Sequence, residues 1–477
     1  MDTFPNYIDG AWVDSPDAIV NLDPSNLEVL GRYARADASA VGVAIAAARA
    51  AFPAWSTCPG EQRANILDAV GSRLLEQQQE LGRLLSSEEG KTLKEGIGEV
   101  VRAGRIFKFF AGEALRPGGE LLDSVRPGVR VEITREPAGV VGLLTPWNFP
   151  IAIPAWKIAP ALAFGNCVVF KPAELVPGSA WMLAKLLHEA GIPRGVFNLL
   201  MGAGGEVGRA IVESPDVDAV SFTGSVGVGR GIALAAVGTG KRFQLEMGGK
   251  NPLVVLEDAD LDLAVEVAVN GAFFSTGQRC TASSRLIVVE AVHDAFVERI
   301  IGRMAKLVTG PALAPDTDIG PVASAEQLGK NLEYLEIGRA EGAEVVGGNR
   351  PPLAQRGHYM KPALFLESSN EMRINREEVF GPLASVIRAR DYDEALAIAN
   401  DTPMGLSAGI CTRSLARATH FKRHSQAGMV MVNLPTAGVD YHVPFGGRKA
   451  SSHGPREQGS YARDFFTTVK TAYEAAG

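Results

Sequence analysis

The sequence predicts an α/β protein in which parallel sheets are covered by helices on both faces. From Ala138 to Phe222, short apolar runs alternate with segments of helical periodicity, and a second series of the same kind begins after Glu246. Apolar runs without alternation are typical of parallel strands, because both faces of such a sheet are buried. The 477 residues, of which 46% are hydrophobic, suffice for about three domains of about 150 residues each.

The part of the chain before residue 116 is predicted to form a hairpin followed by helices. Asp9-Gly10 separates two short apolar runs and suits a type I′ turn, in which both central residues have positive φ. A following run rich in alanine and valine predicts a helix with Asp37 or Ser39 as its N-cap. Residues 61–115 are predicted to be mostly helical.

The two series of strands can be placed from their apolar runs and from the residues that bound them. The first series is predicted at 139–144, 167–170, 196–200 and 219–222. The second is predicted at 252–256, 286–289, 360–365, 384–388, 407–411 and 429–433, with a last strand at 465–469. Helices are predicted up to residue 163, at 177–191, at 206–213, from Asp258 or Asp260 to Phe273, and at 292–307. Parallel sheets of this kind bind ligands at the carboxyl ends of their strands.

Charge and cysteine content exclude several classes of protein. The net charge is −7 and no run of lysine or arginine occurs, so neither a nucleic acid nor an anionic membrane is an expected partner. The four cysteines show no C-x-x-C spacing, which argues against a disulfide framework or zinc knuckle and favours a reducing, cytoplasmic compartment. The start of the chain does not read as a signal peptide, and no apolar run is long enough to span a bilayer. No metal site is expected, because His420 and His424 are at helical spacing but have no third ligand near them in sequence.

Glycine-rich turns are the first candidates for ligand binding. The segments 202–208 and 224–229 each follow a predicted strand and open a helix. A helix N-terminus offers free N–H groups and a positive dipole end, so either turn can hold a pyrophosphate, although both are equally consistent with tight turns that bind nothing. Gly90-Lys91-Thr92 resembles the end of a phosphate-binding loop, but Leu85 stands where that motif needs glycine and no strand precedes it. We therefore reject this third motif.

Cys280 and Glu246 are the candidates for chemistry. Cys280 lies in the small polar segment 275–281 between a predicted helix and strand, whereas a buried structural cysteine more often lies in an apolar run, as Cys167 does. A loop cysteine is a candidate nucleophile, and Arg279 or a helix N-terminus can help it to ionise. Glu246 ends a strand and enters a glycine turn, where it can act as a base, although its position alone favours a surface carboxylate.

Several segments, in order along the chain, match motifs of one enzyme family. They are TPWNFP at 145–150, KPAE at 171–174, FTGS at 222–225, LEMGGK at 245–250, GQRC at 277–280, EVFGP at 378–382 and PFGG at 444–447. On these segments the chain resembles the aldehyde dehydrogenase superfamily over nearly its whole length. The resemblance implies the fold of that family, with a bridging or oligomerisation segment beside two larger domains. The implied domains are a variant doubly wound NAD-binding domain at 1–118 and 140–245, a catalytic domain at 246–440, and the bridging segment at 119–139 and 460–477.

The resemblance also implies a role for each matched residue. Cys280 attacks the aldehyde carbon to form a thiohemiacetal, while the Asn148 amide and the Cys280 backbone N–H bind the oxyanion. After a hydride leaves for the nicotinamide, Glu246 activates the water that hydrolyses the thioester. Lys171 is counted with this catalytic group and, together with Glu174, also meets the adenosine ribose. The residues implied in cofactor binding are Thr145, Pro146, Trp147, Lys171, Pro172, Ala173, Glu174, Gly204, Gly208, Phe222, Thr223, Gly224, Ser225, Met247, Gly248, Glu378 and Phe380.

NAD is the cofactor that the resemblance implies. Glu174 can accept hydrogen bonds from a ribose 2′-hydroxyl, whereas a 2′-phosphate would meet a like charge, so NAD is favoured and NADP is the alternative. The expected partners are a small-molecule aldehyde and further copies of the chain. A homodimer or homotetramer is expected, with the C-terminal strand at 464–471 as the contact.

Three residues are expected to contact the substrate: Arg279, Trp156 and Phe149. An arginine beside the nucleophile can pair with a carboxylate at the far end of a short substrate, or it can brace the loop or stabilise the thiolate. Arg102 and Arg105 are further candidates for binding such a carboxylate.

The expected substrate is a short carboxylated semialdehyde. Segment 437–449 is most similar to α-ketoglutaric semialdehyde (2,5-dioxopentanoate) dehydrogenases, so oxidation of that compound to 2-oxoglutarate in sugar catabolism is the expected reaction. Succinate and glutarate semialdehyde are alternatives, although Trp156 stands where succinate-semialdehyde dehydrogenases carry an arginine. A thiol esterase is a further alternative, but the loop lacks a histidine base beside Cys280. The last alternative is a non-catalytic NAD-binding structural protein, and the joint presence of Cys280, Glu246 and Asn148 argues against it.

Overall fold

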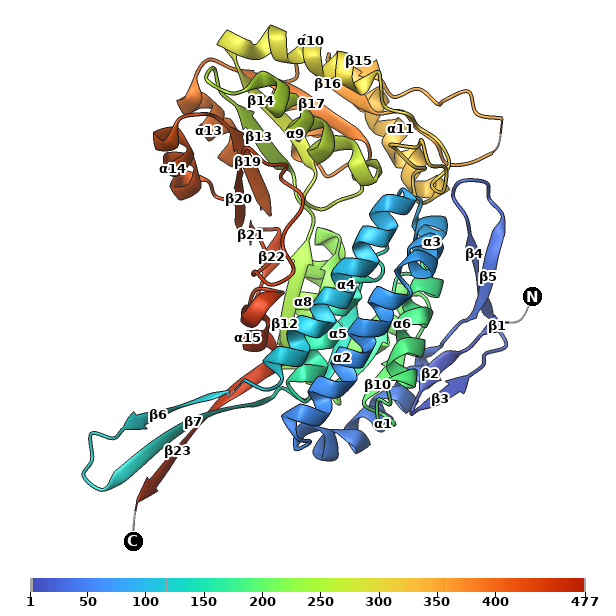
Figure 1. Cartoon of the computed structure of the whole chain (residues 1–477), viewed down its shortest axis with the longest axis vertical. Coiled ribbons are helices and arrows are strands. Elements are labelled where there is room, and N and C mark those ends of the chain that lie inside the picture. Colours follow the sequence, from blue (N-terminus) through green and yellow to red (C-terminus); the bar gives the residue numbers. More distant parts are fainter. Residues whose placement is uncertain (1–2, 117, 355, 476–477) are drawn as a thin grey trace.

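The computed structural model describes residues 3–116, 118–354 and 356–475. It contains two α/β lobes, one above the other, and a three-stranded arm that projects from the lower lobe (Figure 1). The predicted α/β class is confirmed, and the strand order shows where ligands can bind.

The lower lobe is built on an eight-stranded, mainly parallel sheet. Its parallel strands are β8 (Val140–Leu144), β9 (Cys167–Lys171), β10 (Phe197–Leu199), β11 (Ala219–Gly224) and β12 (Arg242–Met247). The antiparallel strands at its edges are β2 (Asn6–Ile8), β3 (Ala11–Val13) and β22 (Ser452–His453). The order is β22-β12-β11-β8-β9-β10-β2-β3, so the winding reverses at β8, between β9 and β11. In doubly wound sheets, ligands bind beyond the carboxyl ends of the strands at such a switch point.

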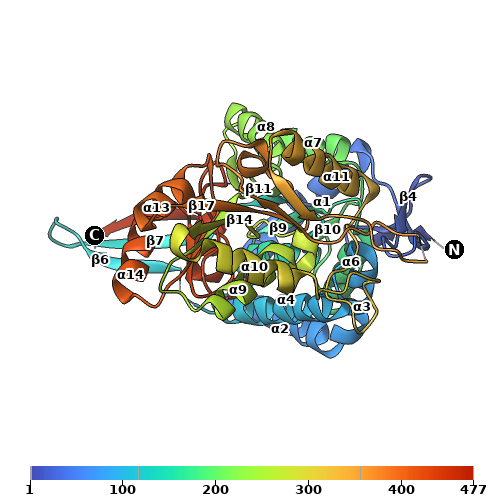
Figure 2. The same ribbon diagram turned by 90° about the horizontal axis from the view of Figure 1, so that it is seen from above.

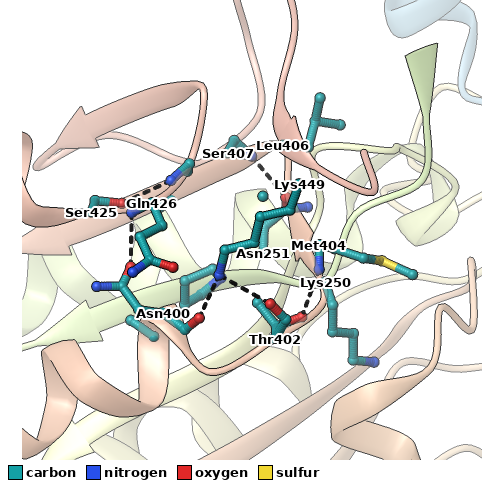
Figure 3. Close-up of a pocket in the computed structure, with 15 residues that line it drawn as sticks. Lys250, Asn251, Asn400, Thr402, Met404, Leu406, Ser407, Ser425, Gln426 and Lys449 are labelled. Atoms are coloured by element: carbon teal, nitrogen blue, oxygen red, sulfur yellow. Dashed lines mark hydrogen bonds between the residues drawn. The ribbon is translucent and has the colours of Figure 1, made fainter. Parts of the chain in front are cut away.

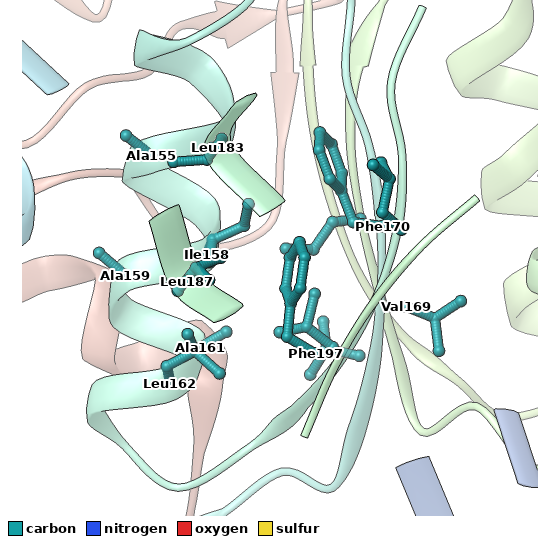
Figure 4. Close-up of a cluster of buried hydrophobic side chains, with 14 of the residues drawn as sticks. Ala155, Ile158, Ala159, Ala161, Leu162, Val169, Phe170, Leu183, Leu187 and Phe197 are labelled. Carbon is teal, nitrogen blue, oxygen red and sulfur yellow. The ribbon is translucent and has the colours of Figure 1, made fainter. Parts of the chain in front are cut away.

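Helices cover both faces of this sheet, as the view from above shows (Figure 2). One face carries α1 (Ala38–Ser56), α7 (Arg209–Glu213) and α8 (Val226–Gly238). The other carries α2 (Gly60–Glu76), α3 (Gln78–Glu89), α4 (Leu93–Glu113), α5 (Ala152–Ala163) and α6 (Pro177–Glu189). Ile158 of α5, Leu187 of α6 and Phe170 of β9 belong to the apolar core between these layers (Figure 4).

Helix α1 differs from the expectation that no apolar run has the length of a membrane span. It has 19 residues and a mean hydropathy of 1.3, which meet that criterion by length and composition. Its buried residues Val41, Ala44, Ile45 and Ala48 recur at helical spacing, and the helix contacts β8 and β9. Its apolar composition therefore serves packing against the sheet.

The upper lobe contains a second, seven-stranded sheet. Its strands are β13 (Asn251–Val255), β14 (Ser283–Val289), β15 (Glu344–Gly347), β16 (Ala363–Leu366), β17 (Leu383–Ala389), β19 (Ser407–Cys411) and β20 (Met429–Val432). The order is β15-β16-β17-β14-β13-β19-β20, and only β15 pairs antiparallel. The main helices are α9 (Leu261–Phe273), α10 (His293–Met304), α11 (Ala325–Ala340), α13 (Tyr392–Asn400) and α14 (Leu415–His424). Leu253 and Val255 pack with α9 and α10, while Val254 between them packs on the opposite face.

Two small three-stranded sheets and the two-stranded pair of β18 (Met404–Gly405) and β21 (Arg448–Lys449) complete the described part of the chain. The arm consists of β6 (Gly119–Asp123), β7 (Val129–Pro137) and β23 (Thr467–Ala475), with β7 in the middle (Figure 1). Near the N-terminus, β1 (Thr3–Phe4), β4 (Ala18–Leu22) and β5 (Val29–Ala34) form the other sheet. The arm therefore joins a middle segment of the chain to its C-terminal strand.

Most of the turns and helix caps that we predicted from local sequence patterns are present in the structure. Asp9 and Gly10 have φ of 50° and 76°, which confirms the type I′ turn. Asp37 accepts a hydrogen bond from the Ala40 N–H, so Asp37 and not Ser39 caps α1. In the same way, Asp260 rather than Asp258 caps α9.

The last predicted strand was placed two residues too early. Phe465 and Phe466 belong to the short helix α15 (Arg463–Phe466), and the strand begins at Thr467. Both phenylalanines pack into the core of the lower lobe, so the chain can leave the body only after them. Helix α11 and strand β15 were not predicted at all.

We predict that Arg285 is essential for the stability of the upper lobe. It is fully buried and donates to the carbonyl oxygens of Lys250, Ile398 and Ala399 at 2.9–3.1 Å. Arg285→Met would leave these acceptors without a donor and should lower the free energy of unfolding by about 3 kcal/mol, with a thermal midpoint several degrees lower. Arg299→Met, which removes an exposed ion pair, is the control and should change stability by less than about 1 kcal/mol. Equal midpoints for both variants would contradict this prediction.

Candidate active site

Cys280 lies where two cavities between the lobes meet. One cavity is lined by the turn after β8, the ends of β11 and β12, and the segment around Glu378. The other is lined by α4, by the start of α5 and by the end of α9. Cys280 lines both, so a reaction at its sulfur can be reached from two sides.

The loop that carries Cys280 has an unusual backbone. Ser275, Thr276 and Gly277 all have positive φ, at 52°, 54° and 64°. A left-handed conformation at two consecutive residues with side chains costs about 1–3 kcal/mol each and persists only where the surroundings impose it. A Cβ on Gly277 would overlap the backbone of Gly381, so this position requires glycine.

Contacts from both lobes hold this loop. The Glu95 carboxylate accepts from the Ser275 backbone N–H at 2.7 Å, and it also takes part in the N-terminal capping box of α4. On the other side, the Asn251 amide donates to the Cys280 carbonyl oxygen at 2.8 Å. The sulfur is therefore fixed relative to both sheets.

The surroundings of Cys280 favour the neutral thiol. Burial, and then the carboxylates of Glu378 and Glu246, raise its pKa to about 12. In the isolated protein, therefore, little thiolate forms at neutral pH. A nearby base or a bound positive charge is needed to activate it.

Asn148 places its side-chain amide in the same region as Cys280. Its Nδ2 donates one hydrogen bond, to the Gln278 carbonyl oxygen at 2.9 Å. An amide nitrogen carries two hydrogens, so a second N–H remains for a ligand. Asn148 also lines the cavity that Cys280 shares, which is the position that an oxyanion donor needs.

Glu246 ends β12 and is 2% exposed. One carboxylate oxygen accepts from Ser452 at 2.5 Å, whereas the other is buried and has no protein partner in the described residues. Burial and the nearby Glu457 carboxylate raise the pKa of Glu246 well above its usual value. A carboxylate with a raised pKa and a free oxygen is suited to taking up a proton near neutral pH. Glu246 is near Cys280 but does not itself line either cavity.

The first cavity fits one end of a dinucleotide. It lies at the switch point of the lower sheet and contains many of the residues predicted for the cofactor. These are Pro146, Trp147, Thr223, Gly224, Ser225, Met247, Gly248, Glu378 and Phe380. The hydroxyl of Thr223 is buried without a partner in the described chain, and a Cβ on Gly248 would overlap the Glu378 carboxylate. The site thus offers an unpaired polar group and a close backbone approach, both of which a nucleotide can use.

A further cavity, of about 490 Å³, continues along the same edge of the sheet. It contains the remaining predicted residues Thr145, Lys171, Gly204, Gly208 and Phe222. Burial lowers the pKa of Lys171, and the neighbouring Glu174 opposes that shift. Glu174 itself is exposed and, like Pro172 and Ala173, does not line the cavity. A role of Glu174 in binding therefore requires a ligand that extends to the rim.

The cavity on the α4 side contains all three residues predicted to contact substrate: Phe149, Trp156 and Arg279. It has a volume of about 350 Å³, which is suitable for a small molecule. Arg102 also lines it, whereas Arg105, the other candidate, is exposed elsewhere on α4. Sequence reasoning missed Glu95, which reaches this cavity from a segment remote from the motifs, and Phe445, which lies in the matched segment 444–447 but was given no role.

A small crevice lies in the upper lobe, at the starts of β13 and β19 and the end of α13 (Figure 3). Lys449 occupies it and donates to the carbonyl oxygens of Asn400 and Thr402 at 2.6 and 3.0 Å. The crevice has room for about one water molecule, with a volume of about 10 Å³. Lys449 therefore fills the crevice, which offers no ligand site.

His420 and His424 stack on each other along α14, and His420 is hydrogen-bonded to Tyr392 at 2.7 Å. Among the described residues, no group of three metal-ligating side chains is found. The pair belongs to an exposed helix face.

The raised pKa of Cys280 predicts how its reactivity depends on pH. Because the folded pKa lies above the ordinary value of 9.0, the alkylation rate of Cys280 in the isolated protein should rise with pH through 9 without levelling off. The rate should change about tenfold per pH unit while the thiolate is the minor form. The measurement is iodoacetamide labelling with mass spectrometry of the Cys280 peptide, and a midpoint below pH 9 would contradict the prediction.

Comparison with known proteins agrees with this geometry. The sequence model described as the aldehyde dehydrogenase family matches residues 12–472. The chain is 43% identical over 481 residues to the alpha-ketoglutarate semialdehyde dehydrogenase of Haloferax volcanii, covering 99% of each chain. It is 41% identical to the alpha-ketoglutaric semialdehyde dehydrogenase of Bacillus subtilis, covering 99% of this chain and 98% of the relative. A betaine aldehyde dehydrogenase from Staphylococcus aureus, solved in complex with NAD+, superposes with a TM-score of 0.96 at 36% identity, covering 99% of this chain and 95% of that one. The chain belongs to the aldehyde dehydrogenase family.

Proposed function

We propose that this protein oxidises a short carboxylated semialdehyde to the corresponding acid with NAD, and that the substrate is 2,5-dioxopentanoate. The observation that carries the proposal is the position of Cys280, whose sulfur is shared by a cavity suited to a nucleotide and one that contains two arginines. The relatives named alpha-ketoglutarate semialdehyde dehydrogenase support the same substrate.

The residues of the chain divide the chemistry between them. Cys280 attacks the aldehyde carbon, and the free N–H of Asn148 stabilises the negative charge that forms on the aldehyde oxygen. When bound, NAD supplies the nicotinamide ring that accepts the hydride, which leaves a thioester on Cys280. Glu246 takes a proton from the water that attacks this thioester, and the acid product is released from the sulfur.

The two arginines support a substrate with a negative charge. The Nε groups of Arg102 and Arg279 are both buried and have no partner within the described chain, although each guanidinium makes one hydrogen bond elsewhere. The carboxylates in the cavity are already bound, Glu99 to Lys91 and Glu95 to Ser275. A carboxylated substrate can therefore pair with the arginines, whereas a quaternary ammonium substrate would be repelled by them.

The cofactor preference rests on Glu174. Its exposed carboxylate lies near Lys171, which lines the cavity of about 490 Å³. There it can accept hydrogen bonds from a ribose hydroxyl and would repel a 2′-phosphate, so we propose NAD rather than NADP. Lys171 supplies the neighbouring donor.

We also propose roles for the larger parts of the chain. The lower sheet forms the cofactor domain, the upper sheet forms the catalytic domain, and the arm joins copies of the chain in a dimer or tetramer. Leu121, Leu122, Val469 and Tyr473 on the arm are all exposed, which supports an apolar contact there. The four cysteines are unpaired, which supports a reducing, cytoplasmic compartment.

The first prediction of this proposal concerns the nucleophile. Cys280→Ala should lower aldehyde oxidation at least about 10⁴-fold, because the covalent route is lost. NADH formation from 2,5-dioxopentanoate is the measurement, and Cys58→Ala, outside the site, is the control and should keep full activity. Wild-type rates in the Cys280 variant would disprove the proposal.

The second prediction concerns the substrate carboxylate. Arg102→Met and Arg279→Met should each lower kcat/KM for 2,5-dioxopentanoate by about 100-fold, which corresponds to about 2–3 kcal/mol for a buried charged hydrogen bond. The same variants should change kcat/KM for pentanal, which lacks the carboxylate, by no more than about threefold. Arg105→Met on the exposed face of α4 is the matched control. If pentanal is the better substrate of the wild-type protein, the proposed substrate class is wrong.

A further inference from the structure

A buried cluster of charges at the junction of α3 and α4 has no part in the chemistry described above. Lys91 is 1% exposed, and its ammonium lies 2.6 Å from the Glu99 carboxylate and 3.9 Å from that of Glu89. The carboxylates of Glu89 and Glu99 are equally inaccessible to water. Transferring charges out of water is unfavourable unless the geometry is exact, so this cluster is a poor device for stability alone.

The cluster is attached to the backbone that carries Asn148. The Lys91 ammonium donates to the Asn148 carbonyl oxygen at 2.7 Å and lies 3.9 Å from the centre of the Phe149 ring. One oxygen of Glu99 accepts from the backbone N–H groups of Ile151 and Ala152 at 2.9 and 3.0 Å. Lys91 and Glu99 therefore fix the middle and the last part of the turn between β8 and α5.

The cluster is also attached to the loop that carries Cys280. Glu89 accepts from the Lys91 backbone N–H at 2.9 Å and from the Gln278 side-chain amide at 3.4 Å. The Gln278 carbonyl oxygen in turn accepts from the Asn148 side-chain amide at 2.9 Å. A closed series of hydrogen bonds thus runs from the Asn148 backbone through Lys91, Glu89 and Gln278 to the Asn148 side chain.

Such a closed series restricts both the peptide and the amide of Asn148. With the carbonyl oxygen bound to Lys91 and one amide N–H bound to Gln278, the remaining N–H has a single direction. That direction matters because an oxyanion donor acts only when it is oriented before the charge develops. A displacement of about 1 Å at a reacting centre can cost a factor of about 100 in rate.

We propose that Lys91 is a positioning residue for the oxyanion site, acting through the Asn148 peptide without touching the substrate. The inference rests on the proposed function, because it takes the Asn148 amide as the oxyanion donor. It assigns a purpose to a buried cation that the reaction itself does not require.

The test compares reactions that need an oxyanion site with one that does not. Lys91→Met should lower kcat about 30- to 100-fold for aldehyde oxidation, with KM changed less than about threefold. Hydrolysis of p-nitrophenyl acetate at Cys280, which needs no cofactor, should fall by a similar factor. Alkylation of Cys280 by iodoacetamide should stay within about twofold of wild type, because displacement at a saturated carbon forms no oxyanion. Lys108→Met, at a half-buried position of α4, is the control and should leave all three rates unchanged.

Two further variants keep the test decisive. The double variant Lys91→Met/Glu99→Gln removes both charges. The side-chain oxygen of the introduced glutamine can still accept from the N–H groups of Ile151 and Ala152, so the double variant should fold even if the single variant does not. It should show the same loss of kcat without a loss of alkylation. In an Asn148→Ala background, Lys91→Met should cause no additional loss of kcat, because both changes remove the same interaction.

Three results would overturn the inference: an unchanged kcat in the folded Lys91 variants, a parallel fall in alkylation, or losses that add to those of Asn148→Ala. A failure of the proposed function is recognised separately. In that case the wild-type protein would hydrolyse the ester but oxidise no aldehyde.

Discussion

The site depends on one constraint: the loop before Cys280 must keep a left-handed backbone at three consecutive residues. Ser275 and Thr276 do not favour this conformation, and the loop has no regular structure of its own to enforce it. The Glu95 carboxylate supplies the restraint from the lower lobe by binding the Ser275 N–H, while it also caps α4. The position of the nucleophile in the upper lobe is thus set by a helix terminus in the lower one.

The ionisable groups at the site are largely buried, and two of its polar groups each keep one unused hydrogen-bonding position. Burial raises the pKa of both Cys280 and Glu246, and the nearby Glu246 carboxylate raises the pKa of Cys280 further. A proton can pass between these two groups only when one of them is ionised, and such a transfer leaves the net charge unchanged, which is less costly than creating a new charge in a dry site. The free oxygen of Glu246 and the free N–H of Asn148 are the open positions in this arrangement.

The sequence predicted many of the elements well, because local patterns carry them, and the residues proposed to react lie together around two adjoining cavities. Asp9-Gly10 forms the predicted turn, the apolar runs form the predicted strands, and Cys280 lies in the polar loop where it was expected. The supporting residues could not be predicted in the same way. Glu95 and Ser275 are 180 residues apart in the chain, and no short motif connects them. Lys91 lies in a segment that resembles part of a phosphate-binding loop, and only its contact with the Asn148 carbonyl connects it to the proposed reaction site.

The separation of the two cavities explains how one fold can serve many aldehydes. The cofactor side is formed by strand ends and glycine turns, where a Cβ on Gly248 would overlap the Glu378 carboxylate and a Cβ on Gly224 the Phe222 ring. The other side is formed by side chains of α4, α5 and the loop before β14, which can change without moving the strands. Arg102 and Arg279 are on this variable side, and Cys280 is the point at which the fixed side and the variable side meet. Substrate preference can therefore change by substitution on α4 while the geometry around the sulfur, held by Glu95, Asn251 and Lys91, stays the same.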